Sequence, residues 1–204
     1  NFTGLSDDCG ATGSATVTFT ATDECGNASE TTATFTILDR VAPSFTAPAV
    51  DLVIECDGTG QLGDIQVWLD NNAGATAEDD CAGMNWSNDY TGLSDGCGST
   101  GEAMVTFTVT DDCGNSKETT ARVIIEDTTP PSIDLAASNE TVPCDGNGNQ
   151  AQLAAWLTAN GNAQASDPCG NVNWTNDFNA LSDDCGATGS VTVTFTTTDD
   201  CGNA

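Results

Sequence analysis

The segment EAMVTFTVT, residues Glu102–Thr110, decides which fold class this chain is expected to have. Within it Val105, Phe107 and Val109 alternate with polar residues, so the apolar side chains share one face of an extended chain. Period-two alternation of β-branched and aromatic residues is typical of a half-buried antiparallel strand. The segment therefore predicts an all-β domain in which one face of a sheet covers a core.

Turn and strand signals around this segment extend the prediction to an antiparallel β-sandwich. The DDCGN sequence at 111–115 is rich in turn formers, and residues 118–126 can supply the return strand. Shorter strands are expected at 52–54 and at 85–90. These strands would supply the second sheet that a β-sandwich needs.

One element of each domain is expected to be helical. Leu62, Ile65, Trp68 and Leu69 recur at helical spacing, and three of the four positions are apolar again further along the chain. Two short amphipathic helices are therefore predicted to cover an end or a face of the sandwich, at 61–70 and 150–159. Ligand stacking is a possible role for Trp68 and Trp156, but their spacing favours core anchors.

The chain repeats this pattern with a period of 88 residues and without insertions. The pentapeptide LSDDC at 5–9 returns as LSDGC at 93–97 and as LSDDC at 181–185. A fixed period indicates an array of similar small domains, with proline-containing joints at 38–43 and 126–131. The predicted domains are the C-terminal part of one repeat at 1–39, a complete repeat at 40–127, and a repeat lacking its last strand at 128–204.

The charge balance excludes several classes of partner. The chain has 31 acidic and 3 basic residues, for a net charge of −28. Nucleic-acid binding needs clustered Lys and Arg, and no apolar run approaches the length of a membrane span, so neither partner is expected. Two interpretations of the acids stay open: solubility through mutual repulsion, or binding of Ca²⁺, which prefers oxygen ligands.

The ten cysteines, four to a repeat, favour disulfides over metal sites, because the chain has no C-x-x-C pair and no histidine. Cys97 and Cys113 flank a strand of about nine residues, roughly 30 Å long, so they are too far apart to be bonded to each other. Inferred strand directions predict four pairs: Cys81–Cys113, Cys56–Cys97, Cys169–Cys201 and Cys144–Cys185. Disulfide-stapled domains imply an oxidising compartment, so a secreted protein is expected.

This arrangement gathers acids at one pole of each domain, next to the joint. Calcium bound there would relieve their repulsion and stiffen the array. The alternative is that Asp and Asn only cap backbone amides in turns. The candidate calcium ligands are Asp39, Asp79, Asp80, Asp111, Asp112 and Asn115 at one joint, and Asp127, Asp167, Asp199, Asp200 and Asn203 at the next.

Catalysis is not expected from this sequence. It contains no histidine, no nucleophile elbow and no phosphate-binding loop. The acids also recur in every repeat at expected turns, where an active site would be out of place. The chain is therefore predicted not to be an enzyme, and no catalytic residue is proposed.

The motif TDDCGN at 110–115, followed by a strand and then DTTPP at 127–131, resembles the hyalin-repeat-like, immunoglobulin-like domains of giant surface proteins in Bacteroidetes-type bacteria. The Trp–Leu helix and the WSN sequence at 86–88 are also similar to those arrays. The resemblance implies tandem Ig-like sandwiches, type IX secretion, and roles in adhesion, surface filaments or gliding motility. It further implies O-glycosylation at Thr128. The sequence DRVAP at 39–43 departs from the usual Asp-Thr-Thr.

The expected function is that of a structural and adhesive segment in a long extracellular surface fibre. Its partners would be neighbouring repeats, other copies in a fibre, and a polysaccharide or a host or cell surface. Two alternatives stay open. The domains could be glycan-binding modules that use Trp86 and Trp174, or a spacer within a large secreted hydrolase.

Overall fold

The computed structural model describes residues 4–81 and 83–204, and it is mainly β with two short α-helices. The all-β prediction is therefore confirmed at the level of class. The strands are β1 (Gly13–Thr22), β2 (Ala28–Ile37), β3 (Ser44–Ala47), β4 (Leu52–Glu55), β5 (Thr76–Glu78), β6 (Met84–Asn88), β7 (Gly101–Asp111), β8 (Ser116–Glu126), β9 (Ser132–Leu135), β10 (Gln164–Ser166), β11 (Val172–Asn176) and β12 (Phe195–Asp199). The helices are α1 (Leu62–Asp70) and α2 (Gln150–Thr158), each followed by a 3₁₀ turn, η1 (Asn72–Gly74) and η2 (Asn160–Asn162).

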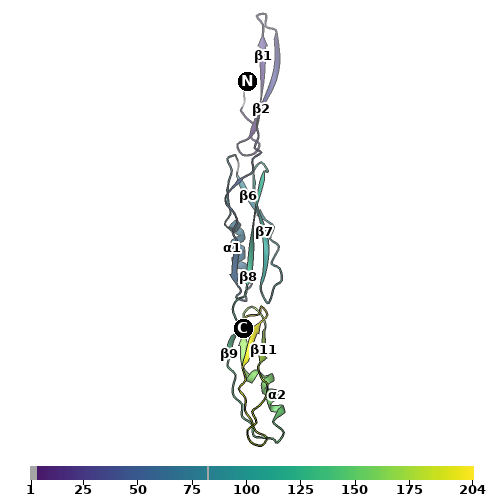
Figure 1. The fold of residues 1–204 in the computed structure, drawn as a ribbon. Coiled ribbons are helices and arrows are strands. Elements are labelled where there is room, and N and C mark those ends of the chain that lie inside the picture. The colour runs from purple at the N-terminus through teal and green to yellow at the C-terminus, as the bar shows by residue number, and fades with distance from the viewer. Residues whose placement is uncertain (1–3, 82) are drawn as a thin grey trace. The chain divides into compact units, whose positions relative to one another are not determined.

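The largest sheet has four strands in the order β4-β8-β7-β6. Figure 1 labels three of them, β6, β7 and β8. β7 is the strand predicted from the alternating segment, and β8 is its predicted return strand. β6 pairs with β7 in antiparallel register, with Trp86 opposite Val109. The remaining strands form two-stranded sheets: β1-β2, β3-β5, β10-β9 and β11-β12.

The chain forms two compact units. The first consists of Asn1–Leu52, Gly63–Gly92 and Ala103–Val123, and the second of Val53–Leu62, Leu93–Glu102 and Ile124–Ala204. Each unit therefore contains one of the two predicted joints, 38–43 in the first and 126–131 in the second. Residues 1–3 of the predicted first domain lie outside the described residues.

The core of the first unit lies between α1 and the inward face of β7 and β8. Val105, Phe107 and Val109 of β7 are all fully buried, as the alternation predicted. The Trp68 ring meets Phe107 edge-on, with ring centroids 5.2 Å apart, and its Nε1 donates a hydrogen bond to the carbonyl oxygen of Val50 at 2.9 Å. Trp68 is thus the core anchor that its helical spacing indicated, with a polar partner for its one donor.

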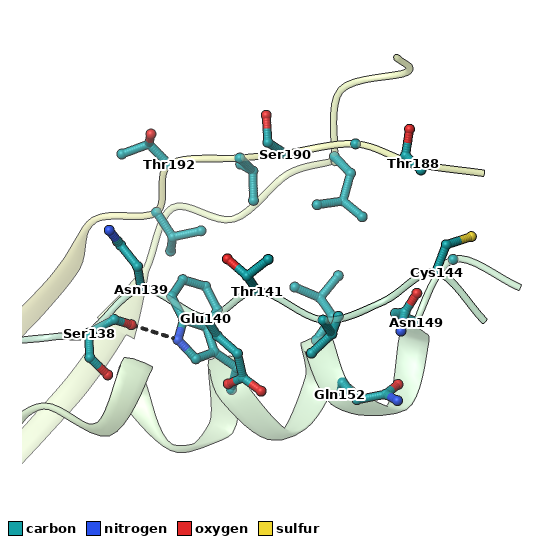
Figure 2. Close-up of a pocket in the computed structure, with 18 of the residues that line it drawn as sticks. Ser138, Asn139, Glu140, Thr141, Cys144, Asn149, Gln152, Thr188, Ser190 and Thr192 are labelled. Atoms are coloured by element: carbon teal, nitrogen blue, oxygen red, sulfur yellow. Dashed lines mark hydrogen bonds between the residues drawn. The ribbon is translucent and has the colours of Figure 1, made fainter. Parts of the chain in front are cut away.

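The second unit has an equivalent tryptophan–phenylalanine contact, but the helix that carries the tryptophan is less buried. α2 carries Trp156, whose ring meets Phe195 edge-on at 5.3 Å and whose Nε1 donates to the carbonyl oxygen of Ser138 at 3.0 Å (Figure 2). None of the residues of α2 is buried, whereas α1 buries Ile65, Trp68 and Leu69. The same local sequence pattern therefore forms the same helix, while the surrounding packing differs.

Phe107 and Phe19 stand 88 positions apart in strands with the same sequence pattern, but Phe107 is 0 % exposed and Phe19 is 57 % exposed. We predict that Phe107→Ala lowers the free energy of unfolding by about 3–5 kcal/mol, because it leaves a cavity against Trp68. Phe19→Ala should change it by about 0.5 kcal/mol or less. Urea unfolding of the oxidised protein, followed by tryptophan fluorescence, tests the pair. Equal losses from both variants would contradict the assigned core.

Candidate functional site: the acidic, disulfide-linked junctions

Three disulfides link different copies of the repeat. Cys9–Cys113 and Cys97–Cys201 each join residues 104 positions apart, both with Cα atoms 5.1 Å apart. Cys56–Cys169 joins residues 113 positions apart. Because the period is 88 residues, every bond crosses from one repeat to the next. Each bond also lies within one compact unit.

The four predicted pairs, Cys81–Cys113, Cys56–Cys97, Cys169–Cys201 and Cys144–Cys185, are therefore wrong. The strand-length argument correctly separated Cys97 from Cys113, which lie beyond opposite ends of β7. The error was to seek each partner within the same repeat. The tip of the β7–β8 hairpin instead reaches the loop that carries Cys9 in the preceding copy, a residue that the prediction had left out.

The four free cysteines are Cys25, Cys81, Cys144 and Cys185. Each occupies a repeat position whose counterpart, 88 or 176 residues away, is bonded. Cys25 corresponds to Cys113 and Cys201, Cys81 to Cys169, Cys144 to Cys56, and Cys185 to Cys9 and Cys97. The free thiols are thus the positions at which another repeat of this kind could be bonded.

Backbone contacts show that the two junctions have the same local structure. The amide of Ala11 donates to the carbonyl oxygen of Cys81 at 2.7 Å, and the amide of Ser99 donates to that of Cys169 at 2.6 Å. Cys81 therefore occupies the place of Cys169 although it has no sulfur partner. The connection between repeats is a repeated structural feature.

Asp199 organises the hairpin tip that carries Cys201. It is 4 % exposed, and its Oδ1 accepts hydrogen bonds from the amides of Cys201 at 2.8 Å and Asn203 at 2.9 Å. The side-chain amide of Asn203 donates to Asp199 Oδ2 at 2.8 Å and to the carbonyl oxygen of Asp127 at 3.0 Å. The tip is thereby attached to the end of the preceding repeat.

Asp111 does the same at the first junction, with Asn115 donating to its Oδ2 at 2.8 Å and to the carbonyl oxygen of Asp39 at 3.4 Å. Burial acts to raise the pKa of Asp111 and of Asp199, but hydrogen bonds from their Asn partners and from nearby backbone amides outweigh it, so each pKa is lowered. Both groups are therefore carboxylates at neutral pH. Both aspartates thus cap the turns at their hairpin tips, with Asn115 and Asn203 as tethers.

Three other aspartates each have a buried oxygen without a hydrogen-bond partner: Oδ2 of Asp39, Asp127 and Asp167. The other oxygen of each accepts one backbone amide, from Val41 at 3.0 Å for Asp39, from Thr129 at 3.2 Å for Asp127, and from Cys169 at 2.7 Å for Asp167. A buried carboxylate oxygen without a donor is costly unless a cation faces it.

Asp127 lies at the centre of the second acidic cluster. One of its oxygens lies within 4.8 Å of ligand atoms of Asp199 and Cys201, and one within 4.8 Å of those of Asp167 and Cys169. Burial and the negative charges of Asp167, Asp199 and Glu55 raise the pKa of Asp127, against the lowering effect of the Thr129 amide. The second unit contains no Lys or Arg in its sequence, so no basic side chain of its own can offset these charges.

The first junction gathers Asp39, Asp111 and Cys113 in the same way. Asp39, Asp79 and Asp80 line a small cavity of about 200 Å³ together with Cys81. Burial, followed by the charges of nearby aspartates, raises the pKa of the Cys81 thiol. Because Cys113, Cys169 and Cys201 are oxidised, their sulfurs are not thiolates. The donors that remain are carboxylate oxygens at the second junction, and carboxylate oxygens with the Cys81 thiol at the first. Such a set suits a hard cation.

Asp112 and Asp200 accept hydrogen bonds from a neighbouring loop. Asp112 Oδ2 accepts the amide of Gly83 at 2.9 Å, and Asp200 Oδ2 accepts the amide and side chain of Asn171 at 2.9 and 3.0 Å. Both aspartates thus connect the hairpin tip to a neighbouring loop. As ligand predictions they have less support than Asp39, Asp127 and Asp167.

Glu55 is a junction residue that the sequence argument missed. Its Oε1 accepts from the amide of Thr128 and the hydroxyl of Thr129, both at 2.8 Å, and its Oε2 accepts from the hydroxyl of Thr128 at 3.0 Å. The backbone hydrogen bond from Thr128 is the main cause that lowers the pKa of Glu55. The Thr128 hydroxyl, proposed as a glycosylation site, is thus engaged in holding the linker.

The two candidate glycan-contact residues are half-buried. Trp86 of β6 packs on Phe45, with ring centroids 6.0 Å apart, and Trp174 occupies the same position of β11. Across the described residues, no helix is long and apolar enough to cross a membrane. No protein-family model matches the chain, and no curated protein matches it in sequence.

We predict that the oxidised protein contains four alkylatable thiols, at the free positions named above. Cys201→Ser should expose one additional thiol, at Cys97, because only that bond is lost. Peptide mapping without reduction, after alkylation under denaturing conditions, tests both statements. Linked peptides that pair Cys97 with Cys56, or Cys113 with Cys81, would contradict the arrangement.

Proposed function

We propose that this chain is a load-bearing segment of an extracellular surface fibre built from tandem Ig-like repeats, with adhesion or surface motility as the purpose of the fibre. The observation that carries the proposal is the pair of equivalent disulfides, Cys9–Cys113 and Cys97–Cys201, which join consecutive repeats at the same offset. Catalysis does not require a covalent link between consecutive repeats. A fibre under tension benefits from one, because the link carries load from one repeat to the next.

The bonds create a covalent path that bypasses most of the chain. From Cys9 the path crosses to Cys113, returns along β7 to Cys97, and crosses again to Cys201. It contains only the 16-residue step between Cys97 and Cys113, whereas the backbone from Cys9 to Cys201 is 192 residues long. Force applied along the chain would therefore be carried by β7 and the disulfides.

This path limits how far the protein can stretch. Sixteen extended residues span roughly 55 Å, and 192 residues span roughly 650 Å. β7 is already an extended strand of 11 residues, so unfolding the rest would add little length. A fibre built in this way keeps its length under load even where individual domains open.

Calcium binding at the junctions is the second part of the proposal. Asp127 and Asp167 each have a buried oxygen without a partner, and burial together with the charges of neighbouring acids raises the pKa of Asp127. Ca²⁺ takes carboxylate oxygens in flexible geometry and would be held by these residues and Asp199. It would offset the repulsion between the two sides of the junction. The equivalent ligands at the first junction would be Asp39, Asp79 and Asp111.

Glycan recognition is a further candidate function, favoured by the half-exposed rings of Trp86 and Trp174 at equivalent strand positions. Aromatic rings next to Asn and Asp side chains are suited to stacking on sugars. Within a fibre, weak contacts of this kind would be multiplied by the number of repeats. If the segment were a spacer in a secreted hydrolase, Trp86 and Trp174 would need no ligand-binding role.

We predict that pulling on the termini of the oxidised protein extends the Cys9–Cys201 interval to roughly 55 Å, and that reduction raises this to roughly 650 Å. Cys9→Ser is the matched control. The shortest path then runs through Cys56–Cys169, contains 79 residues, and spans roughly 270 Å. Single-molecule force spectroscopy measures all three. Full extension of the oxidised wild type would refute a load-bearing role for the bonds.

We also predict that Ca²⁺ raises the melting temperature. At a hundredfold excess over its dissociation constant, one bound ion adds about 2.7 kcal/mol, or roughly 5–10 °C for a chain of this size. A raised carboxyl pKa destabilises the folded protein at pH values above it, so Asp127→Asn should melt higher than the wild type in EDTA. Ca²⁺ should also raise the melting temperature of Asp127→Asn by less than it raises that of the wild type.

The control variant is Asp183→Asn, which removes an exposed carboxylate. It should melt like the wild type in EDTA and keep the full response to Ca²⁺. Calorimetry with Mg²⁺ in place of Ca²⁺ separates specific binding from general screening of the charge. No response to either ion would mean that the junction acids are not a cation site.

A further inference from the structure

The linker at the first junction contains an exposed arginine. Among the three basic residues of the chain, all of which the structure describes, Arg40 alone lies outside the strands, whereas Lys117 and Arg122 belong to β8. Arg40 is exposed, Val41 is 71 % exposed, and the stretch 38–43 between β2 and β3 has no regular secondary structure. Proteolytic nicking concentrates in exposed, irregular segments, and β8 is an inner strand of its sheet. The Arg40–Val41 bond therefore suits a protease that cleaves after basic residues.

The second junction has no such bond. By the 88-residue period, Thr128 stands in the place of Arg40 and Thr129 in the place of Val41. Both threonines are also held by hydrogen bonds to the carboxylate of Glu55. Susceptibility to a protease of this specificity is thus a property of the first junction.

A cut between Arg40 and Val41 would not separate the two sides of the first junction. Cys9 precedes the bond, Cys113 follows it, and the two are joined by a disulfide. The hairpin tip that carries Cys113 also holds the linker, because the side-chain amide of Asn115 donates to the carbonyl oxygen of Asp39 at 3.4 Å. The cleaved linker would therefore stay at the junction.

The residue that follows the bond lines an acidic cavity. This cavity of about 200 Å³ is lined by Val41 together with Asp39, Glu78, Asp79 and Asp80, and none of its lining residues is basic. The Val41 amide nitrogen donates to Asp39 Oδ1 at 3.0 Å, while Asp39 Oδ2 is buried without a hydrogen-bond partner. A positive charge on this nitrogen would therefore lie within hydrogen-bond distance of a carboxylate with one oxygen unpaired.

We propose that the Arg40–Val41 bond is a processing site for a trypsin-like endopeptidase, and that cleavage places the new α-ammonium group of Val41 against Asp39 in the acidic cavity. In this step the oxygen of a water molecule bonds to the carbonyl carbon of Arg40, and the C–N bond to Val41 breaks. Both protons of the water end on the nitrogen, so Val41 gains an ammonium group and Arg40 ends in a carboxylate.

The cleaved chain thereby supplies its own positive charge to the first junction. Because Arg40 is exposed, its new carboxylate can turn away into solvent, whereas the Val41 nitrogen is already beside Asp39. The two sides of the cut would then be held by the disulfide and by an ion pair. Full separation would need both the protease and a reductant.

Limited digestion of the oxidised protein with trypsin tests the processing site. One early cut after Arg40 is expected, and the product should keep its full size without reductant and release the peptide 1–40 after reduction. Arg40→Thr, which introduces the residue of the second junction, should resist the enzyme. Early cuts after Lys117 or Arg122, or equal digestion of Arg40→Thr and the wild type, would overturn the proposal.

Thermal melting of the cut and uncut protein, in EDTA and without reductant, tests the ion pair independently of any calcium site. Cleavage should raise the melting temperature by roughly 2–4 °C. Asp39→Asn keeps an acceptor for Val41 but removes the charge, so its cut and uncut forms should melt alike. Asp183→Asn, which removes an exposed carboxylate elsewhere, should keep the full gain. A cut wild type that melts no higher than the uncut protein would refute the ion pair, as would an equal gain in Asp39→Asn.

Discussion

The disulfide between a hairpin tip and the preceding repeat is the constraint on which the junctions depend. Cys201 can meet Cys97 only if the tip that carries it reaches across the joint, and the tip is the turn built by Asp199 and Asn203. The same reach brings Asn203 onto the carbonyl oxygen of Asp127. Covalent bond, turn and acidic cluster therefore form together, and the same set recurs at the first junction around Asp111 and Cys113.

A small core explains why such connections are needed. In the first unit the packed interior consists of a few residues from α1, β7 and β8, centred on Phe107 and Trp68. Domains of about this size bury only a modest fraction of their surface and commonly rely on disulfides or metal ions. Here the three disulfides are placed between repeats, where they bond consecutive copies to each other.

The alternation in β7 and the helical spacing around Trp68 predicted their elements because both signals are local. Cysteine pairing could not be predicted in the same way, since a strict repeat offers several equivalent partners at the same pole. Distance excluded Cys97 as the partner of Cys113, but it did not distinguish Cys81 from Cys9 in the previous copy.

The acidic junction also protects the bonds that it surrounds. Cys81 is a free thiol whose pKa is raised, first by burial and then by the charges of Asp39, Asp79, Asp80 and Asp111. Thiol–disulfide exchange requires the thiolate, so a raised pKa slows attack by Cys81 on the neighbouring Cys9–Cys113 bond. Negative charge at the joint therefore opposes disulfide reshuffling.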